Sequence, residues 1–399
     1  MVNLNLMQAY SLYLHIPFCR HRCGYCDFNT YAGQENFIPD YVSALCREIE
    51  LCAASTGQAL PVHTIFFGGG TPSLLTPGQI ERILLAVQAG FDLLPGLEIT
   101  LEANPGTLSL EYLRQLHGLG VNRLSLGMQS ANPFELRLLE RQHDTFAVIQ
   151  AASWARRAGF DNLNLDLIFG LPEQELSTFQ HTLEFALQLQ PDHFSLYALT
   201  LEHGTPLANW AKRGLLSEPD PDQAADMYEW ASARLEQAGF AQYEISNWGK
   251  LREGETLACR HNLQYWRGLP YLGLGAGAHG FAAGVRTANV LAPSAYIQRC
   301  LNGQAQPFPR TPATQTFQQV SREAEIAETM MMGLRLTEEG VSEAAFQQRF
   351  GKRLEDIFNA QIKRLTGLGL IEWKGGSPRA LRLTSRGRLL GNQVFVEFI

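Results

Sequence analysis

Three cysteines at close spacing are the residues of this sequence that most plainly could do chemistry. Cys19, Cys23 and Cys26 form a C-x3-C-x2-C array directly after the apolar run of residues 12–16. One short loop with this spacing can wrap three thiolates around one face of a cubic iron–sulfur cluster, and it offers no fourth thiolate. One iron would therefore be open to an exogenous ligand that can receive an electron, which is the arrangement of a site that does chemistry.

Two simpler interpretations compete with the cluster: a structural zinc site, and three unrelated buried thiols. Zinc usually takes four ligands from paired C-x2-C units, which this array lacks. Three cysteines within eight residues, with Tyr25 beside the last of them, argue against chance. The spacing therefore favours a cluster held by Cys19, Cys23 and Cys26.

The segments that must position this loop alternate between short apolar runs and longer amphipathic runs from residue 11 to about residue 240. The predicted strands are residues 12–16, 63–67, 97–102, 123–126, 162–168 and 193–197. The predicted helices lie near residues 36–56, 77–90, 109–118, 144–158, 174–189 and 222–238. Six such units in series predict parallel strands with right-handed crossovers, and hence a barrel or a large part of one.

Glycine and polar residues follow the predicted strands, at the rim where the active site of such a barrel lies. The GGGTP segment, residues 68–72, follows the second strand; its amides could bind a carboxylate, although a tight turn is the simpler interpretation. Glu102 and Asp166 lie on apolar strands, where an unpaired carboxylate would be costly. Each could accept hydrogen bonds from a ribose or an ammonium group, or form a buried ion pair with a partner such as Arg123 or Arg141.

The cysteine loop and the strand-end motifs together resemble the radical S-adenosylmethionine (SAM) superfamily. In that superfamily a C-x3-C-x2-C loop holds a [4Fe-4S] cluster whose fourth iron is chelated by the amino and carboxylate groups of SAM. GGGTP is similar to the superfamily's glycine motif for the SAM amino group, and Glu102 is similar to its ribose contact. The resemblance implies a [4Fe-4S] cluster and SAM as cofactors on a partial (β/α)6 TIM-like barrel.

More narrowly, five motifs resemble the oxygen-independent coproporphyrinogen III oxidase group and its close relative, the heme chaperone HemW family. They are YLHIPFC, FFGGGTPS, LEANPG, LSLGMQS and LDLIFGLP. In that group two SAM molecules can be bound. By position, the resemblance implies that the first SAM contacts Tyr13, Gly69 and Glu102. It implies that the second contacts Tyr25, Gly70, Thr71, Gln129, Arg141, Asp166 and Ala198.

Residues 241–290 depart from this alternation and are rich in aromatic residues and glycine. His261 and Tyr265 are four positions apart, so they would share one face of a helix, and Trp266 follows them. A histidine beside large aromatic rings could ligate heme iron, although such a stretch is more often core or interface. The HNxxYW string resembles the element that HemW proteins share and associate with heme binding, so these three residues are the predicted heme contacts.

The last part of the chain, residues 320–399, shows a pattern of three helices followed by a small hairpin, which predicts a winged-helix-like module. Between positions 349 and 388 there are ten basic residues against three acidic ones, so DNA binding is an alternative. The same tail accompanies the HemW resemblance, and one modest basic face is often a solvated surface. We therefore predict a lid or docking role and no nucleic acid partner.

The predicted fold class is α/β, in three parts. A radical SAM partial barrel takes residues 1–245, an HNxxYW-containing extension and linker takes residues 246–310, and a small α+β winged-helix-like domain takes residues 311–399. Residues 291–319 hold four prolines and are predicted to be a linker of low regularity.

The resemblance leaves two functions of different classes. One is an enzyme that oxidatively decarboxylates two propionates of coproporphyrinogen III, and the other is a chaperone that binds heme and passes it on. The oxidase group continues its cysteine loop with a fourth cysteine, where this chain has Phe28, and it begins with a longer arm than the eighteen residues before Cys19. We therefore predict the chaperone, with the oxidase as the alternative. A third possible function is that of a radical SAM enzyme with another substrate, because the fold and the cluster do not determine the substrate.

Composition and cysteine use suggest the setting. The chain of 399 residues is 45% hydrophobic and 18% charged, with a formal net charge of −7. The apolar runs are shorter than the ~20 residues that span a bilayer, and the scattered remaining cysteines do not form a secreted disulfide pattern, so we expect a cytoplasmic protein. The expected partners are heme, recipient hemoproteins or apo-cytochromes, and an electron donor for the cluster. No catalytic residue is assigned, and SAM cleavage, a homodimer and peripheral membrane contact through recipients stay open.

Overall fold

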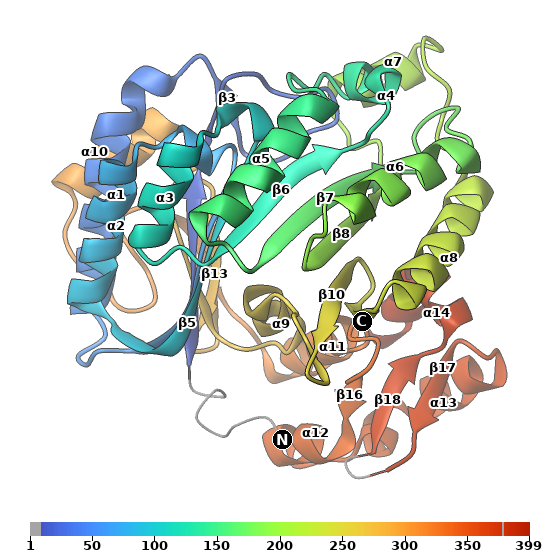
Figure 1. Ribbon diagram of the computed structural model, residues 1–399. Coiled ribbons are helices and arrows are strands. Elements are labelled where there is room, and N and C mark those ends of the chain that lie inside the picture. Colours follow the sequence, from blue (N-terminus) through green and yellow to red (C-terminus); the bar gives the residue numbers. More distant parts are fainter. Residues whose placement is uncertain (1–8, 377–378) are drawn as a thin grey trace. The chain divides into compact units, whose positions relative to one another are not determined.

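The computed structural model describes residues 9–376 and 379–399 (Figure 1). Within them the chain forms two compact units. The first holds the chain up to residue 231 together with residues 270–318, and the second holds residues 232–269 and 319–399. The three-part division at residues 245 and 310 stays a prediction. The prediction that the segment before Cys19 is shorter than the arm of the oxidase group falls partly on residues 1–8. These residues lie outside the described residues.

Six parallel strands form the centre of the first unit and confirm the predicted partial barrel. Each pairs with the next in chain order, as in an opened TIM barrel. They are β1 (Tyr10–Ile16), β4 (Pro61–Gly69), β5 (Asp92–Ala103), β6 (Arg123–Gln129), β7 (Leu163–Phe169) and β8 (His193–Ala198). Within the described residues the barrel does not close, because the second neighbour of β1 is β12 (Tyr271–Leu274), which pairs with it in parallel.

Helices between these strands lie outside the sheet (Figure 1). The long crossovers are α1 (Ile38–Ala54), α2 (Pro77–Gly90), α3 (Leu110–Gly118), α5 (Thr145–Ala158) and α6 (Leu176–Gln188). Local signals fix their ends: Thr76 caps α2 in a reciprocal capping box with Gln79, and Asp144 caps α5, which ends at Gly159 in the left-handed region. Two short helices are α4 (Pro133–Leu138) and α7 (Pro206–Lys212). The longer α8 (Pro221–Gln237) begins in the first unit and ends in the second. No helix in the described part of the chain is long and apolar enough to cross a bilayer.

The return segment after β12 is more regular than the sequence pattern predicted. It contains β13 (His279–Ala282), β14 (Val285–Asn289), α10 (Pro293–Asn302) and β15 (Thr314–Gln319). The prediction of a linker of low regularity at residues 291–319 was therefore wrong. Pro293 stands in the first turn of α10, where its missing N–H costs no hydrogen bond. Tyr296 and Cys300, one helical turn apart, are fully buried, so the helix has an apolar face that the prolines obscured.

A buried carboxylate joins α1 to this return segment. Glu48 is fully buried and accepts four hydrogen bonds, two on each carboxylate oxygen. The donors are Gly275 N at 2.8 Å, Asn289 Nδ2 at 2.9 Å, Tyr296 OH at 2.7 Å and Thr311 Oγ1 at 2.6 Å. Burial raises the pKa of Glu48 and these hydrogen bonds oppose the rise.

The second unit has its own core and confirms the predicted winged-helix-like module. Its C-terminal part holds the helices α11 (Arg322–Gly333), α12 (Glu343–Phe350) and α13 (Leu354–Gly367). A small antiparallel sheet has the strand order β16 (Val341–Ser342), β18 (Ala380–Leu383), β17 (Ile371–Lys374). The short helices α14 (Ser385–Leu389) and α15 (Gly391–Phe395) follow. Apolar residues of these elements, among them Leu334, Phe346, Ile362 and Leu383, form one buried cluster. The same unit contains β9 (Phe240–Glu244), β10 (Asn247–Arg252), β11 (Glu255–Thr256) and α9 (Arg260–Trp266).

Several basic residues of this module are ion-paired. The pairs include Arg349 with Glu325 at 2.6 Å, Arg364 with Glu397 at 2.8 Å and Lys374 with Glu338 at 3.0 Å. These three carboxylates lie outside the window of residues 349–388 in which the basic surplus was counted. The surplus is therefore partly neutralised by acidic residues that the window left out, which weakens the electrostatic case for DNA.

Candidate functional site

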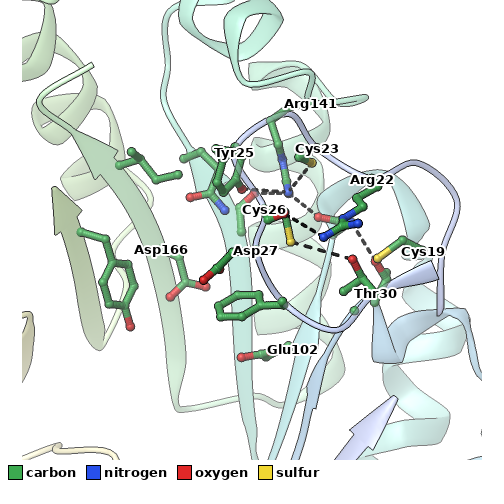
Figure 2. Close-up of a pocket in the computed structure, with 18 of the residues that line it drawn as sticks. Cys19, Arg22, Cys23, Tyr25, Cys26, Asp27, Thr30, Glu102, Arg141 and Asp166 are labelled. Atoms are coloured by element: carbon green, nitrogen blue, oxygen red, sulfur yellow. Dashed lines mark hydrogen bonds between the residues drawn. The ribbon is translucent and has the colours of Figure 1, made fainter. Parts of the chain in front are cut away.

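A pocket of about 470 Å³ opens at the carboxyl ends of the parallel strands in the first unit (Figure 2). Its size is that of a small-molecule site. Twelve of the residues predicted from the sequence line it: Cys19, Cys23, Tyr25, Cys26, Gly69, Gly70, Thr71, Glu102, Gln129, Arg141, Asp166 and Ala198. Tyr13 is not among the lining residues; it lies on β1 with its hydroxyl 3.0 Å from Nδ1 of His15.

The cysteine loop is tied to the glycine motif through the backbone. The amide of Gly70 donates to the carbonyl of Ile16 at 2.8 Å, and the amide of Thr71 donates to the carbonyl of Phe18 at 2.8 Å. A Cβ atom at position 70 would lie 2.6 Å from that Phe18 carbonyl oxygen, so only glycine fits this close approach. The motif after β4 therefore holds the start of the cysteine loop in place.

Each of the three loop sulfurs has one polar side chain within hydrogen-bonding distance. The pairs are Thr71 Oγ1 to Cys19 Sγ at 3.5 Å, Arg141 Nη1 to Cys23 Sγ at 3.6 Å, and Thr30 Oγ1 with Cys26 Sγ at 3.9 Å. Such donors suit thiolates that ligate iron, because hydrogen bonds to cluster sulfur stabilise its negative charge. The donor set fits an iron–sulfur cluster in this respect.

Burial disfavours the thiolate forms of Cys19 and Cys26 when no metal is bound. Burial raises the pKa of Cys19 to about 11 and also raises the pKa of Cys26. Iron binding must therefore displace protons from the loop. Among the described residues, no three His, Cys, Asp or Glu side chains form a group placed to hold one metal ion.

Arg141 connects the cysteine loop to the neighbouring strand ends. Besides Cys23, its Nη1 donates to the hydroxyl of Tyr25 at 3.5 Å, and its Nη2 donates to the carbonyl of Gly127 at 2.9 Å and to Oδ1 of Asn104. Its Nε atom is buried without a hydrogen-bond partner among the described residues. A buried unpaired donor in a pocket is an available contact for a ligand acceptor.

Two carboxylates, Glu102 of β5 and Asp166 of β7, also line the pocket (Figure 2). Glu102 accepts a hydrogen bond from the amide of Gly69 at 3.1 Å, and burial together with the nearby charge of Asp166 raises the pKa of Glu102 to about 7. Asp166 accepts from Ser125 Oγ at 2.9 Å and from Asn164 Nδ2 at 2.8 Å, and burial raises its pKa. Both can accept hydrogen bonds from ligand hydroxyl groups.

The structure adds Asn104, a pocket residue that sequence reasoning did not single out, and it shows an unusual backbone conformation at Gln129, which was predicted. Asn104 donates to Thr71 Oγ1 at 3.2 Å and accepts from Arg141, so it joins two loops of the pocket. Its place in the LEANPG motif was a usable signal. Gln129 has a left-handed φ of 65° at a register shift in β6, which is uncommon outside glycine and often found at functional sites.

The predicted heme residues lie on α9 in the second unit, apart from the pocket residues in the sequence. His261 is 1% exposed, and its Nε2 lies 2.8 Å from the hydroxyl of Tyr265, with the two rings nearly perpendicular. The guanidinium of Arg335 lies over the ring of Trp266 at 4.4 Å. The helix therefore brings His261 and Tyr265 together as their spacing implied, but with the imidazole buried and hydrogen-bonded.

A barrel of parallel strands that presents three cysteines, and no fourth, at its rim is the architecture of radical SAM proteins. The radical SAM superfamily model matches residues 13–186, and the model of the HemN C-terminal domain matches residues 320–390. The superfamily implies a [4Fe-4S] cluster and SAM.

Relatives along the whole chain define the family more closely. The heme chaperone HemW of Bacillus subtilis (strain 168) is 40% identical over 390 residues, which cover 98% of this chain and 99% of that protein. The heme chaperone HemW of Mycobacterium tuberculosis (strain ATCC 25618 / H37Rv) is 40% identical over 393 residues, 97% of this chain and 94% of that protein. The chain belongs to the HemW family.

A solved structure supports the same fold. The coproporphyrinogen III oxidase HemN from Escherichia coli, described as a radical SAM enzyme, superposes with a TM-score of 0.80 at 25% identity. The superposition covers 98% of this chain and 90% of the oxidase. The two close relatives that the motifs resembled are therefore both found, one by sequence and one by structure.

Proposed function

We propose that this protein binds heme and passes it to hemoproteins such as apo-cytochromes. The observation that carries the proposal is the 40% identity to a heme chaperone along 98% of the chain, which spans the pocket, α9 and the C-terminal module. Phe28 supports it from the site: it lines the pocket at the position where the oxidase group has a fourth cysteine.

Two cofactors accompany this function. Cys19, Cys23 and Cys26 hold a [4Fe-4S] cluster, whose chemistry when bound is the donation of an electron to a ligand at its open iron. The pocket beside the loop holds SAM, with Glu102 and Asp166 accepting from hydroxyl groups and Arg141 offering its unpaired Nε. The SAM contacts implied by the resemblance are Tyr13, Tyr25, Gly69, Gly70, Thr71, Glu102, Gln129, Arg141, Asp166 and Ala198.

The α9 residues His261, Tyr265 and Trp266 remain the heme contacts that the HNxxYW resemblance implies. For His261 to ligate iron, its Nε2 must exchange the Tyr265 hydroxyl for the metal and the buried ring must turn outward. We further propose a cytoplasmic setting, where free cysteines and a cluster persist. An electron donor, a recipient hemoprotein, a homodimer and membrane contact through the recipient complete the proposal.

The alternative function is decarboxylation of coproporphyrinogen III, which the similarity of fold to the oxidase HemN favours. An anaerobic experiment separates the two. The cluster is reconstituted, and hemin and coproporphyrinogen III are offered separately with SAM and a reductant, while absorbance and product mass are followed. The chaperone proposal predicts stoichiometric uptake of heme and no loss of carbon dioxide from the porphyrinogen. Conversion to protoporphyrinogen would overturn it in favour of the oxidase.

A further inference from the structure

A row of buried polar side chains crosses the sheet beside Asp166, and the cofactor assignments do not use it. Asn164 lies two positions before Asp166 on β7, so the two side chains are on the same face of the sheet. The strand register places Ser125 of β6 and His193 of β8 on either side of Asn164, and all three residues are buried. The inward positions of a parallel barrel are usually filled by branched apolar side chains, so a polar row there needs a reason.

The amide of Asn164 holds both oxygens of the Asp166 carboxylate. Its Nδ2 donates to Oδ1 of Asp166 at 2.8 Å and to the hydroxyl of Ser125 at 2.7 Å. Ser125 in turn donates to Oδ2 of Asp166 at 2.9 Å. The carboxylate is therefore held directly on one oxygen and through Ser125 on the other. Because a carboxylate has about four acceptor positions, it keeps capacity for a ligand hydroxyl group.

The other end of the same amide is oriented by β8. Oδ1 of Asn164 lies 2.6 Å from Nδ1 of His193 and accepts from the hydroxyl of Ser195 at 3.2 Å. Burial, and then the charge of Arg123, lower the pKa of His193 well below its usual range, so the ring is neutral and its proton lies on Nδ1 to make this bond. A rotated amide would turn its oxygen toward the Asp166 carboxylate. His193 and Ser195 therefore keep the donor end of Asn164 on Asp166.

We propose that Asn164 is a positioning residue for the nucleoside end of SAM, because it aims the Asp166 carboxylate at the ribose hydroxyl groups. The inference rests on the proposed binding of SAM and extends that site to Asn164 and His193, neither of which lines the pocket. Burial raises the pKa of Asp166, and hydrogen bonds from its neighbours oppose the rise. Asn164 therefore also favours the charged carboxylate, which is the stronger acceptor.

The simpler interpretation is that the polar row satisfies its own hydrogen bonds and stabilises the barrel. The two interpretations differ in how an effect on SAM depends on Asp166. A residue that acts through the Asp166 carboxylate loses its influence on SAM when that carboxylate is absent, whereas a structural residue keeps its influence.

A double-mutant cycle between Asn164 and Asp166 tests the proposal. Isothermal titration calorimetry measures the SAM affinity of the anaerobically reconstituted protein, of Asn164→Ala, of Asp166→Ala and of the double variant. Asn164→Ala should weaken SAM binding about tenfold, and Asp166→Ala should weaken it at least as much. The double variant should bind SAM no more weakly than Asp166→Ala alone. Equal losses from Asn164→Ala in the two backgrounds would overturn the proposal.

A second pair of variants tests the orientation of the amide without changing Asn164. His193→Leu removes the donor to Oδ1 of Asn164, whereas His193→Asn keeps an amide donor near the position of Nδ1. The first should weaken SAM binding and the second should retain most of the affinity. If Asn164→Ala does not fold, this pair decides: a His193→Leu protein that binds SAM like the unchanged protein would overturn the proposal.

Asn289→Ala is the matched control for general damage to the fold. Asn289 is also a buried asparagine of the first unit, with its amide bonded to Glu48 and to the carbonyl of Gly275, but it does not line the pocket. Its replacement should lower stability and leave the affinity for SAM unchanged. Iron and sulfide content are measured for every variant, so that loss of the cluster is distinguished from loss of SAM binding.

The outcomes test the inference and the proposed function separately. If the unchanged protein does not bind SAM, the cofactor assignment in the proposed function fails, and the inference fails with it. If the unchanged protein binds SAM and Asn164→Ala binds it equally well, only the role of Asn164 is overturned.

Discussion

Nη1 of Arg141 lies 3.6 Å from the Sγ atom of Cys23, across 118 positions of sequence. The same nitrogen donates to the hydroxyl of Tyr25, and the other arm of the guanidinium reaches Asn104 and Gly127. A partly buried cation thereby lies against one sulfur of the proposed cluster and against the wall of the proposed SAM pocket. A positive charge that donates to sulfur favours the reduced, more negative state of an iron–sulfur cluster.

Replacement of Arg141 should therefore change the electronic properties of the cluster. Arg141→Gln removes the charge, so we expect the midpoint potential to shift to more negative values. Arg141→Lys keeps the positive charge but loses the planar guanidinium with its several donors, so the midpoint potential should shift less in this variant. Redox titration of the reconstituted protein, followed by electron paramagnetic resonance, measures both. Thr71→Val removes the neutral donor to Cys19 and is the matched comparison; a potential that Arg141→Gln leaves unchanged would refute the role of the guanidinium.

The raised pKa of Glu102 should make stability depend on pH. The pKa is about 7 in the folded protein against an ordinary 4.5, so the folded protein binds this proton more tightly than the unfolded chain. The resulting stability is complete below pH 4.5 and is lost as the pH rises through about 7, and it amounts to at most about 3 kcal/mol.

Glu102→Gln removes the ionisation and retains the shape of the side chain and an oxygen for the Gly69 amide. The free energy of unfolding, from urea titrations at about pH 5 and about pH 8, should therefore fall less with rising pH in the variant than in the unchanged protein. Equal slopes in the two proteins would show that Glu102 does not titrate in this range.

The alternation of runs predicted the centre of the fold well. Glu102 and Asp166 are far apart in sequence, yet both line one pocket, because parallel strands place their carboxyl ends at the same edge and each residue lies on or near a predicted strand. The cysteine loop and GGGTP were located for the same reason. The local hydrophobic pattern and the direction of the strands were sufficient to predict that these residues lie at one edge of the sheet.

Long-range pairing was not predictable in the same way. The parallel pairing of β12 with β1 joins residues about 260 positions apart, as at Leu12 and Leu272, and nothing local in either strand encodes it. The helical face of α10 was hidden by its prolines, which act only at its first turn. The resemblance located Arg141 by position, but its contact with Cys23 depends on how the chain after α4 folds back, since the amide of Arg141 bonds to the carbonyl of Leu136.

The buried carboxylate Glu48 should be among the most important residues for stability. Glu48→Ala leaves the Tyr296 and Thr311 hydroxyls and one amide hydrogen of Asn289 without an acceptor in a buried place, so we expect a loss of at least about 3 kcal/mol in the free energy of unfolding. Glu50→Ala, at an exposed position of the same helix, should cost within about 0.5 kcal/mol. Urea unfolding followed by circular dichroism compares the two; similar losses would contradict the role given to Glu48.

The metal assignment of the cysteine loop makes the last prediction. Cys23→Ala removes one of three thiolates, and no fourth cysteine in the loop can replace it, so iron and acid-labile sulfide should fall steeply after anaerobic reconstitution. Cys46→Ala should retain both in full, because Cys46 is a partly exposed thiol of α1 that does not line the pocket. Zinc uptake distinguishes an iron–sulfur cluster from a structural zinc site. A protein that binds one zinc ion and no sulfide under the same conditions would have the zinc site. We expect the unchanged protein and Cys46→Ala to take up iron together with sulfide, and Cys23→Ala to lose this uptake. The three sulfurs and their hydrogen-bond donors are the reason for this expectation.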